Sequence, residues 1–218
     1  MNMLKISKIE TLGTHEGPGV RFVVFLQGCN YNCIYCHNPE TLCTKGGKKI
    51  SDDELIKQII SNKSYFGKKG GVTFSGGEPL LQAKKLVRIV KKLKQENIHI
   101  AIDTNGSIIN EDVKELLSMV DLILLDVKQI EKKAFEGVTG SNFNIAFSVA
   151  KYLKENEKLK FWIRYVLVPN FTDKCSTIKK VGEFFSDYTN LEQVEILPYH
   201  SFGEKKYEEY KIKRKHKN

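Results

Sequence analysis

The sequence of 218 residues has no long hydrophobic run and no apolar core near its N-terminus. A membrane-spanning helix needs about 20 consecutive apolar residues, and a signal peptide needs an apolar core of roughly 7 to 15 residues. The first residues, MNMLKISKIETLGTHEGPG, contain neither pattern. We therefore expect a cytoplasmic protein that does not associate with membranes.

Cysteine is scarce and odd in number, with five residues in the chain. A disulfide framework is typical of small secreted domains with an even number of cysteines, so this count argues for metal binding or catalysis. Cys29, Cys33 and Cys36 fall within eight residues, whereas Cys43 and Cys175 stand apart. We expect the first three to act together and the other two to be unliganded thiols.

Acidic residues are outnumbered by basic ones, which gives a formal net charge of +9 at pH 7. Lysines dominate the excess, at exposed helical spacing in AKKLVRIVKKLKQEN and again in the C-terminal KIKRKHKN. Proteins that stack nucleic-acid bases combine such charge with interleaved aromatic and arginine side chains, and no such stripe is present. We expect a solvated basic surface and no nucleic-acid partner.

Short β-rich runs alternate with helical patterns along the whole chain, which is typical of a parallel sheet built from βα units. The length fits one domain, residues 1–218. The six predicted strands are Arg21 to Gln27, Gly71 to Phe74, Ile98 to Asp103, Asp121 to Lys128, Lys160 to Val168 and Glu192 to Tyr199. The predicted helices are LIKQII, capped by Ser51 with Glu54 three residues on, then Pro79 to Glu96, Glu111 to Val120, Asn142 to Asn156 and Lys174 to Ser186.

Ligands of parallel α/β proteins bind where the carboxyl ends of the strands open. The segments that follow the predicted strands are polar, glycine-rich or able to bind metal: residues 29–36, 75–78, 103–106, 126–128 and 198–200. A structural α/β domain would also place turn residues there, but not thiols, a carboxylate-lysine pair and a histidine together. We expect the functional site at this face.

Cys29-x-x-x-Cys33-x-x-Cys36 places three thiolates on one tight loop after the first predicted strand. Such a set can hold one 4Fe-4S cluster and leaves one iron open for a ligand. The run CIYCH also matches the attachment pattern of c-type haem, but that requires export and leaves Cys29 unexplained. A zinc site of the three cysteines and His37 is the other alternative, although such sites usually split their ligands into two separated pairs.

Several longer motifs occur in one order: GTHEGPGVRFVVFLQGCNYNCIYCHNPET, GGVTFSGGEPLLQ, DTNG, LLDVKQ, WIRYVLVP and LPYH. In these motifs, from about Ile6 to Tyr210, the chain resembles the pyruvate formate-lyase activating enzymes, a family of the radical S-adenosylmethionine superfamily. The three-cysteine pattern alone would indicate only the superfamily, whereas YCHNP and LPYH are more specific.

The resemblance implies an open partial (β/α)6 barrel of parallel strands. It implies one 4Fe-4S cluster, bound by Cys29, Cys33 and Cys36, whose open iron chelates S-adenosylmethionine, and reductive cleavage to a deoxyadenosyl radical. The implied partners are a glycyl-radical enzyme, chiefly pyruvate formate-lyase, and a low-potential electron donor such as flavodoxin or ferredoxin. The alternatives are the activase of anaerobic ribonucleotide reductase and a non-catalytic zinc-binding module.

The resemblance also implies roles for the residues around the cluster. Tyr35, Cys36 and His37 would lie beside the adenine and the cluster. Gly76 and Gly77 lack side chains, so their backbone could approach the methionyl amine at a free strand edge.

Further residues are implied at the other strand ends. Asp126, Val127 and Lys128 would handle the ammonium and the carboxylate or ribose, and His200 would close the pocket. Arg164 is a weaker candidate for the carboxylate. Asp103 would hold a monovalent cation together with Asp126.

Two features of the chain bear on the kind of activating enzyme. Many relatives carry an inserted cysteine-rich segment between the first strand and the Gly-Gly motif, where this chain has only Cys43, which favours the pyruvate formate-lyase type. Relatives continue beyond LPYH with a further helix and strand, whereas this sequence ends in YKIKRKHKN, so we expect a short C-terminal end.

The glycine-rich loop from Gly13 to Gly19 precedes the first predicted strand and carries one carboxylate, Glu16. An open barrel leaves a lateral gap that admits a peptide. We hypothesise that Glu16 and this loop receive the partner's peptide backbone at the barrel mouth, with an ordinary surface turn as the alternative.

Overall fold

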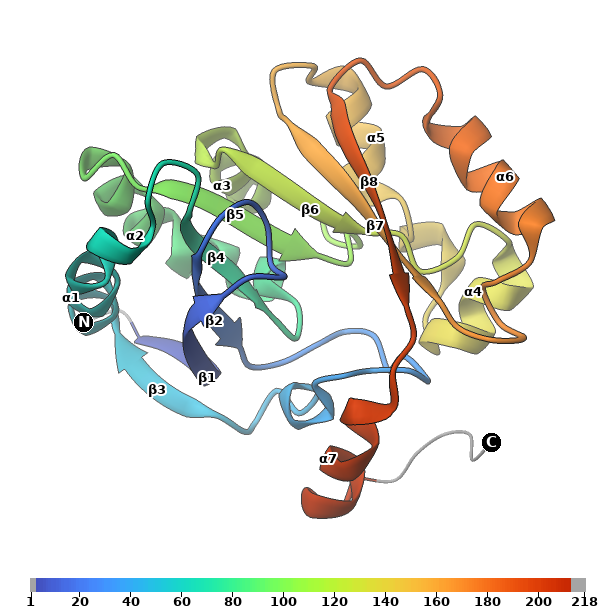
Figure 1. Cartoon of the computed structure of the whole chain (residues 1–218), viewed down its shortest axis with the longest axis horizontal. Helices are drawn as coiled ribbons and strands as arrows, with labels where there is room; N and C mark the ends of the chain where they lie inside the picture. The colour runs from blue at the N-terminus through green and yellow to red at the C-terminus, as the bar shows by residue number, and fades with distance from the viewer. Residues whose placement is uncertain (1–2, 213–218) are drawn as a thin grey trace.

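The computed structural model describes residues 3–212, and its strands form one eight-stranded sheet in the order β3-β1-β2-β4-β5-β6-β7-β8 (Figure 1). The strands are β1 (Met3–Gly13), β2 (Arg21–Leu26), β3 (Lys48–Ser51), β4 (Gly71–Gly76), β5 (His99–Thr104), β6 (Leu122–Asp126), β7 (Phe161–Leu167) and β8 (Leu191–Pro198). The α-helices are α1 (Asp52–Ser61), α2 (Ala83–Gln95), α3 (Glu111–Met119), α4 (Lys132–Thr139), α5 (Ser148–Glu155), α6 (Cys175–Phe185) and α7 (Glu204–Glu209). Within residues 3–212, no helix is long and apolar enough to cross a membrane.

Six strands pair in parallel: β2, β4, β5, β6, β7 and β8. The sheet ends at β3 and β8 without closing. The predicted open partial barrel of six parallel strands is therefore confirmed. Strand β1 was not predicted; it pairs antiparallel with β2 and with β3, and so extends the sheet beyond the first parallel strand.

The two faces of the sheet bury different sets of side chains. Alternate residues of β5, β6 and β7, such as Ile102, Ile123 and Phe161, belong to the large core that the helices share. The residues between them form a small cluster on the opposite, concave face: Ala101, Leu122 and Leu124, with Trp162 packed against it. Because successive strand residues point to opposite faces, both faces are apolar in the middle of the sheet.

The predicted helices are largely confirmed. The amide of Glu54 donates to Ser51 Oγ over 3.2 Å, as the capping pattern predicts, and α2, α3 and α6 lie within the predicted ranges. The segment before α2 is a 3-10 turn, Pro79–Gln82, rather than α-helix. The helix predicted from Asn142 to Asn156 is split, because Asn142 caps a 3-10 turn, Phe143–Ile145, and α5 begins only at Ser148.

Two strands and two α-helices of the described residues were not predicted from the sequence: β1, β3, α4 and α7. Strand β1 is marked only by the alternation of buried Leu4 and Ile6 with lysines, and β3 has four residues. Helix α4 contains a glycine and a threonine, which are poor helix formers, and it is stabilised by the burial of Phe135. Helix α7 lies just before the basic C-terminal stretch, whose residues 213–218 are outside the described part of the chain.

Arg21, the first residue of β2, is fully buried at the amino-terminal end of the parallel strands. Its Nε donates to Thr73 Oγ1 over 2.9 Å, and its Nη2 donates to the carbonyl of Val72. Its Nη1 lies 3.1 Å from His99 Nδ1. Burial lowers the pKa of Arg21 to about 10, which leaves it charged at neutral pH. One cation therefore connects β2, β4 and β5.

We predict that Arg21→Leu lowers the free energy of unfolding by roughly 3 kcal/mol, because it leaves several buried acceptors without a donor. Urea denaturation followed by circular dichroism measures the change. The exposed Lys84→Leu is the control and should leave the unfolding midpoint unchanged. Equal midpoints for both variants would mean that the buried guanidinium does not stabilise the sheet.

Candidate functional site

The loop after β2 carries the three clustered cysteines. At Gly28 a φ of +100° turns the chain out of the strand. All five cysteines of the chain are free; Cys33 is buried, and Cys29 and Cys36 are partly buried. Burial raises the pKa of the three thiols, that of Cys29 to about 12. Without a bound cation the thiols are therefore protonated at neutral pH, and binding a metal would release their protons.

Helix α4, which the sequence analysis missed, holds the middle of this loop. The amide of Asn32 donates to the carbonyl of Thr139, and the amide of Ile34 donates to that of Val138, both over 2.9 Å. Carbonyls in the last turn of a helix have no partner within the helix. The C-terminal end of α4 thus satisfies the loop's amides and fixes the backbone around Cys33.

Gly76 and Gly77 lie at the end of β4, against the start of the cysteine loop. Gly76 pairs with Leu26 of β2, and the amide of Gly77 donates to the carbonyl of Leu26 over 2.9 Å. The prediction that they line a free strand edge is wrong, because β4 lies between β2 and β5 in the sheet. A Cβ atom at Gly77 would overlap the carbonyl oxygen of Gly28, so the missing side chain is needed for this close packing.

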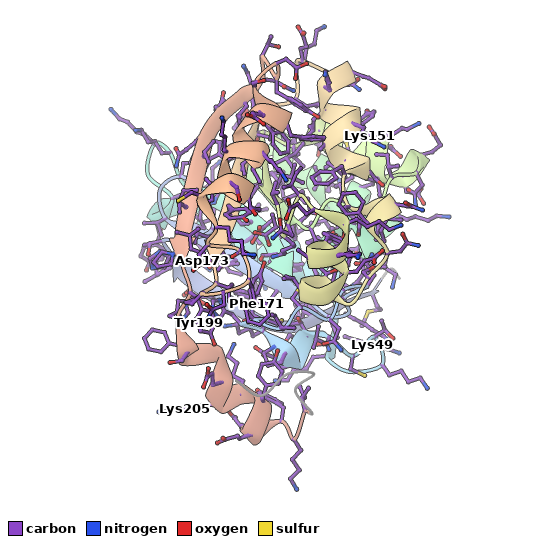
Figure 2. The ribbon with its side chains drawn as sticks, turned by 90° about the vertical axis from the view of Figure 1, so that its right-hand side faces the viewer. Lys49, Lys151, Phe171, Asp173, Tyr199 and Lys205 are labelled. Carbon is purple, nitrogen blue, oxygen red and sulfur yellow. The ribbon has the colours of Figure 1, made fainter. Side chains whose placement is uncertain are left out.

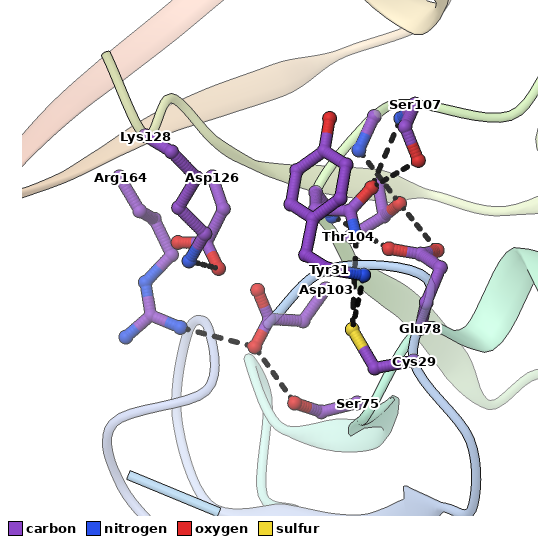
Figure 3. A network of polar contacts seen from close by, with 12 residues as sticks. Cys29, Tyr31, Ser75, Glu78, Asp103, Thr104, Ser107, Asp126, Lys128 and Arg164 are labelled. Atoms are coloured by element: carbon purple, nitrogen blue, oxygen red, sulfur yellow. Dashed lines mark hydrogen bonds and ion pairs between the residues drawn. The ribbon is translucent and has the colours of Figure 1, made fainter. Parts of the chain in front are cut away.

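Glu78 follows the glycines and is fully buried. Its Oε1 accepts from Thr104 Oγ1 (2.7 Å) and from the amide of Leu80 (3.0 Å), and its Oε2 accepts from the amide of Asn105 (2.8 Å) (Figure 3). Burial raises the pKa of Glu78 to about 7, against the effect of these three donors. Since every contact is a donor, we assign the ionised form. The carboxylate links the ends of β4 and β5.

Asn105 continues this network to the first cysteine. Its Nδ2 donates to Asn30 Oδ1 over 3.1 Å and lies 4.0 Å from Cys29 Sγ, while its Oδ1 accepts from the Ser107 hydroxyl over 2.6 Å (Figure 3). The amide of Tyr31 also donates to Cys29 Sγ, over 3.4 Å. Two N–H groups thus lie near the sulfur of Cys29, and the hydrogen bond from Tyr31 favours its thiolate form against the effect of burial.

Asp126 and Lys128 lie at the end of β6 and face each other, as their spacing predicts. Lys128 Nζ donates to Asp126 Oδ2 over 2.6 Å and lies 5.7 Å above the ring of Tyr35. Burial lowers the pKa of Lys128, but Asp126, Tyr35 and Cys33 together outweigh burial, so the pKa is raised well above its usual value. Lys128 is therefore cationic beside the cysteine loop.

Two of the expected cofactor residues have buried side chains. Tyr35 packs in an apolar cluster with Val138 and Val168, and its hydroxyl has no hydrogen-bond partner among the described residues. Val127 belongs to the main core. Contacts of Val127 with a cofactor would therefore involve its backbone.

Asp103 and Arg164 pair on the concave face of the sheet (Figure 3). Asp103 Oδ2 accepts from Ser75 Oγ (2.8 Å) and from Arg164 Nη1 (3.2 Å), whereas Asp103 Oδ1 is buried without a partner among the described residues. Burial raises the pKa of Asp103 against the charge of Arg164. Arg164 also lies 3.2 Å from Glu195 and donates to the carbonyl of His15. Arg164 thus connects Asp103 with Glu195 and the loop at His15, and its contact with the carboxylate of a cofactor stays a prediction.

His37 and His200 meet outside the cysteine loop. Their rings stack with centroids 4.0 Å apart, and His37 Nε2 lies 3.0 Å from the carbonyl oxygen of His200. Burial lowers the pKa of His37, which keeps the ring neutral at pH 7. His200 itself is exposed and lies just beyond β8. It therefore contacts the predicted pocket residues through His37.

The loop from Gly13 to Gly19 lies against the concave face of the sheet, not at the mouth as hypothesised. The carbonyl of Glu16 accepts from Thr73 Oγ1 over 2.6 Å, and a side chain at Gly17 would contact Leu124 and Ala101. Burial and the charge of Asp103 raise the pKa of Glu16. The loop packs against the middle of the strands because Arg164 and Thr73 bind its carbonyls.

Cys43 and Cys175 are exposed, unlike the three clustered thiols. Zinc with bonds of about 2.3 Å would require its ligand atoms to lie roughly 4 Å from one another. Within residues 3–212, no three cysteine, histidine, aspartate or glutamate side chains are close enough to hold a single metal ion.

Sequence reasoning missed several residues that support the site. Glu78 and Asn105 were noted only as members of strand-end segments, although a carboxylate before a proline in a glycine-rich turn could have been examined as a cap. Lys206 donates to Asn38 Oδ1 and Glu40 Oε1, and no local pattern marks it among the many lysines.

Comparisons with known proteins agree with this geometry. The 4Fe-4S single cluster domain family matches residues 15–145. The pyruvate formate-lyase-activating enzyme of Clostridium pasteurianum is 43% identical, over 97% of this chain and 89% of the relative. The pyruvate formate-lyase 1-activating enzyme of Escherichia coli K12 is 40% identical, over 95% of this chain and 87% of the relative.

Solved structures are also similar. A domain of pyruvate formate-lyase-activating enzyme from Bacteroides vulgatus is 30% identical, with a TM-score of 0.56, over 60% of this chain and 81% of that one. Streptococcus suis SuiB, solved bound to S-adenosylmethionine, is 16% identical and shares the fold, with a TM-score of 0.62 over 83% of this chain and 38% of its own. With two curated relatives at 40% identity or more over nearly the whole chain, this chain belongs to the pyruvate formate-lyase-activating enzyme family.

Proposed function

We propose that this chain activates a glycyl-radical enzyme of the pyruvate formate-lyase type, with residues 1–218 acting as one radical S-adenosylmethionine domain in the cytoplasm. The observation that carries the proposal is the set of three free thiols on one loop, at the carboxyl ends of the parallel strands. The names of the relatives supply the reaction type and the partner.

Cys29, Cys33 and Cys36 would hold the 4Fe-4S cluster. Thiolates are the usual ligands of such clusters. The three sulfurs are close enough for their charges to interact, since Cys36 and Cys29 each raise the pKa of Cys33. The N–H groups around Cys29 would offset the negative charge that the cluster brings.

S-adenosylmethionine would bind between the cysteine loop and the end of β6. A 4Fe-4S cluster held by Cys29, Cys33 and Cys36 would supply the electron for the reductive cleavage of S-adenosylmethionine. Around it, the backbones of Gly76, Gly77 and Val127 would border the methionyl group, and Asp126 and Lys128 would bind its polar groups. His37, stacked on His200, would lie beside the adenine with Cys36 and the Tyr35 backbone.

A monovalent cation would fit beside Asp103. Its Oδ1 is buried and has no partner among the described residues, and Asp126 is near enough to raise its pKa. An unpartnered buried carboxylate oxygen is costly unless a cation neutralises it. Asp103 and Asp126 would supply the oxygen ligands.

The substrate would be a glycine-bearing loop of the partner, admitted through the open side of the sheet between β8 and β3. A low-potential donor such as flavodoxin or ferredoxin would supply the electron.

The first prediction concerns the cluster. Cys29→Ala, Cys33→Ala and Cys36→Ala should each lose an intact cluster, because two thiolates cannot hold it. Iron analysis and visible absorbance after anaerobic reconstitution measure this, with Cys43→Ala and Cys175→Ala as matched controls. Stoichiometric zinc in place of iron in the wild type would instead support the non-catalytic module.

The second prediction concerns the cofactor. Asp126→Ala and Lys128→Ala should weaken S-adenosylmethionine binding by roughly 1.5 to 3 kcal/mol through loss of a charge-assisted hydrogen bond, with iron content unchanged. His200→Ala should weaken S-adenosylmethionine binding less, because the variant removes only the ring that stacks on His37. Isothermal titration of the reconstituted protein measures the affinities. The exposed Lys151→Ala, on α5 (Figure 2), is the control, and wild-type affinity in the first two variants would refute this placement.

The third prediction concerns the partner. Incubation with reductant, S-adenosylmethionine and a pyruvate formate-lyase should give the glycine-centred doublet in electron paramagnetic resonance. Under the same conditions an anaerobic ribonucleotide reductase should give none. A doublet that forms only with the reductase would support the alternative activase. Deoxyadenosine release without a doublet on either partner would indicate another substrate.

A further inference from the structure

The segment after β8 crosses the outside of the cysteine loop. It contains a 3-10 turn, Ser201–Gly203, and helix α7. Figure 2 shows Tyr199 and Lys205 on this segment. Tyr199, like Phe171, packs against the apolar cluster of Tyr35, Val138 and Val168. The end of the described chain therefore lies against the residues that follow the third clustered thiol.

Lys206 of α7 makes the central contact. Its ammonium donates to the carbonyl of His37 (2.8 Å), to Asn38 Oδ1 (2.9 Å) and to Glu40 Oε1 (2.9 Å). A lysine has three N–H donors, and all three have acceptors within four consecutive residues. These acceptors begin one residue after Cys36, so the ammonium fixes the backbone on which that thiol depends.

Glu40 makes the contact strong. Its side chain is only 8% exposed, and its Oε2 is buried without a hydrogen-bond partner among the described residues. Lys206 is 28% exposed, so the pair is largely shielded from water. Removal of the lysine would leave a buried carboxylate without its counter-charge, and the chain near Glu40 would have to move to hydrate it.

A second contact supports the same stretch of chain. A Cβ atom at Gly203 would lie 3.0 Å from the carbonyl oxygen of Cys36 and from the Cα of His37, so the turn before α7 packs directly on this backbone. Together with the stacked rings of His37 and His200, these contacts cover residues 36–40 from outside.

We propose that Lys206 is a positioning residue that clamps residues 36–40 and thereby holds the Cys36 thiol on the iron-sulfur cluster. The inference rests on the proposed function for the cluster itself. Lys206 contacts neither the thiols nor the expected cofactor residues Asp126 and Lys128 in any hydrogen bond of the described chain. Its hydrogen bonds therefore act on the loop and not on the thiols, while its charge is near enough to lower the pKa of Cys36.

The experiment compares Lys206→Met with Lys205→Met, the neighbouring exposed lysine on the same helix (Figure 2). Reconstituted proteins are mixed with an iron chelator, and the loss of visible absorbance gives the rate of cluster loss. We expect Lys206→Met to lose the cluster at least about tenfold faster than wild type, because the variant loses all three hydrogen bonds of the ammonium, one of them to the Glu40 carboxylate. Lys205→Met should match wild type.

Two further variants separate the ion pair from the bulk of the side chain. Lys206→Arg keeps the charge, so its rate of cluster loss should be close to that of the wild type. The double variant Lys206→Met with Glu40→Gln removes both charges and should lose the cluster more slowly than Lys206→Met alone, because no unpaired carboxylate remains buried.

Hydrogen exchange of the chain before reconstitution tests the clamp without the cluster. In Lys206→Met the amides of residues 36–42 should exchange faster, with those of β4 to β7 unchanged. Equal rates of cluster loss in Lys206→Met and Lys205→Met, or faster exchange throughout the sheet, would overturn the clamp. A wild type that takes up no iron would instead contradict the proposed function, while the exchange result would still decide the clamp.

Discussion

The contact between Gly77 and Gly28 is the constraint on which the site depends. It brings the end of β4 against the first turn of the cysteine loop, closer than any side chain would permit. The amide of Glu78 donates to the carbonyl of Gly28 over 2.8 Å, so the loop begins as a continuation of the sheet's hydrogen bonding. Glu78 then binds the amide of Asn105 at the end of β5, and the side-chain amide of Asn105 contacts the sulfur of Cys29. The first thiol is therefore placed by two neighbouring strands, although it lies on neither.

On the concave face of the sheet, the carboxylates around Arg164 and Lys128 outnumber these two bases. Asp103, Glu195 and Glu16 all interact with the single guanidinium of Arg164, and Asp126 pairs with Lys128. Burial raises the pKa of Asp103 and of Glu16, which indicates that these carboxylates lack sufficient counter-charge. A cationic ligand would relieve this excess. The sulfonium of S-adenosylmethionine and a monovalent cation both have the required sign, so the electrostatics of the strand ends agree with the ligands proposed for them.

Much of the site was predictable because it lies at strand ends, whose positions follow from the alternation of β-rich runs and helices. The three cysteines and the facing of Asp126 toward Lys128 needed only sequence spacing and the geometry of one strand. Contacts between distant segments could not be predicted in this way. The sequence did not reveal that Arg164, a weaker candidate for the carboxylate of the cofactor, pairs with Glu195 and with the carbonyl of His15, which lie on other elements. Likewise, α4 was missed because its local helix propensity is weak, and its stability comes from the packing of Phe135.

The cysteine loop has little regular structure between Gly28 and Asn38, so distant parts of the chain must bind its backbone groups. The end of α4 binds the amides of Asn32 and Ile34, and Lys206 binds the carbonyl of His37, which is 169 residues away in the sequence. Contacts of such high separation form only after the entropy of closing long loops has been overcome. The backbone around Cys33 and the residues after Cys36 are therefore held by segments that lie far from them in the sequence. The geometry of the cysteine loop thus depends on contacts from the whole fold, although the three proposed cluster ligands lie within the first 36 residues.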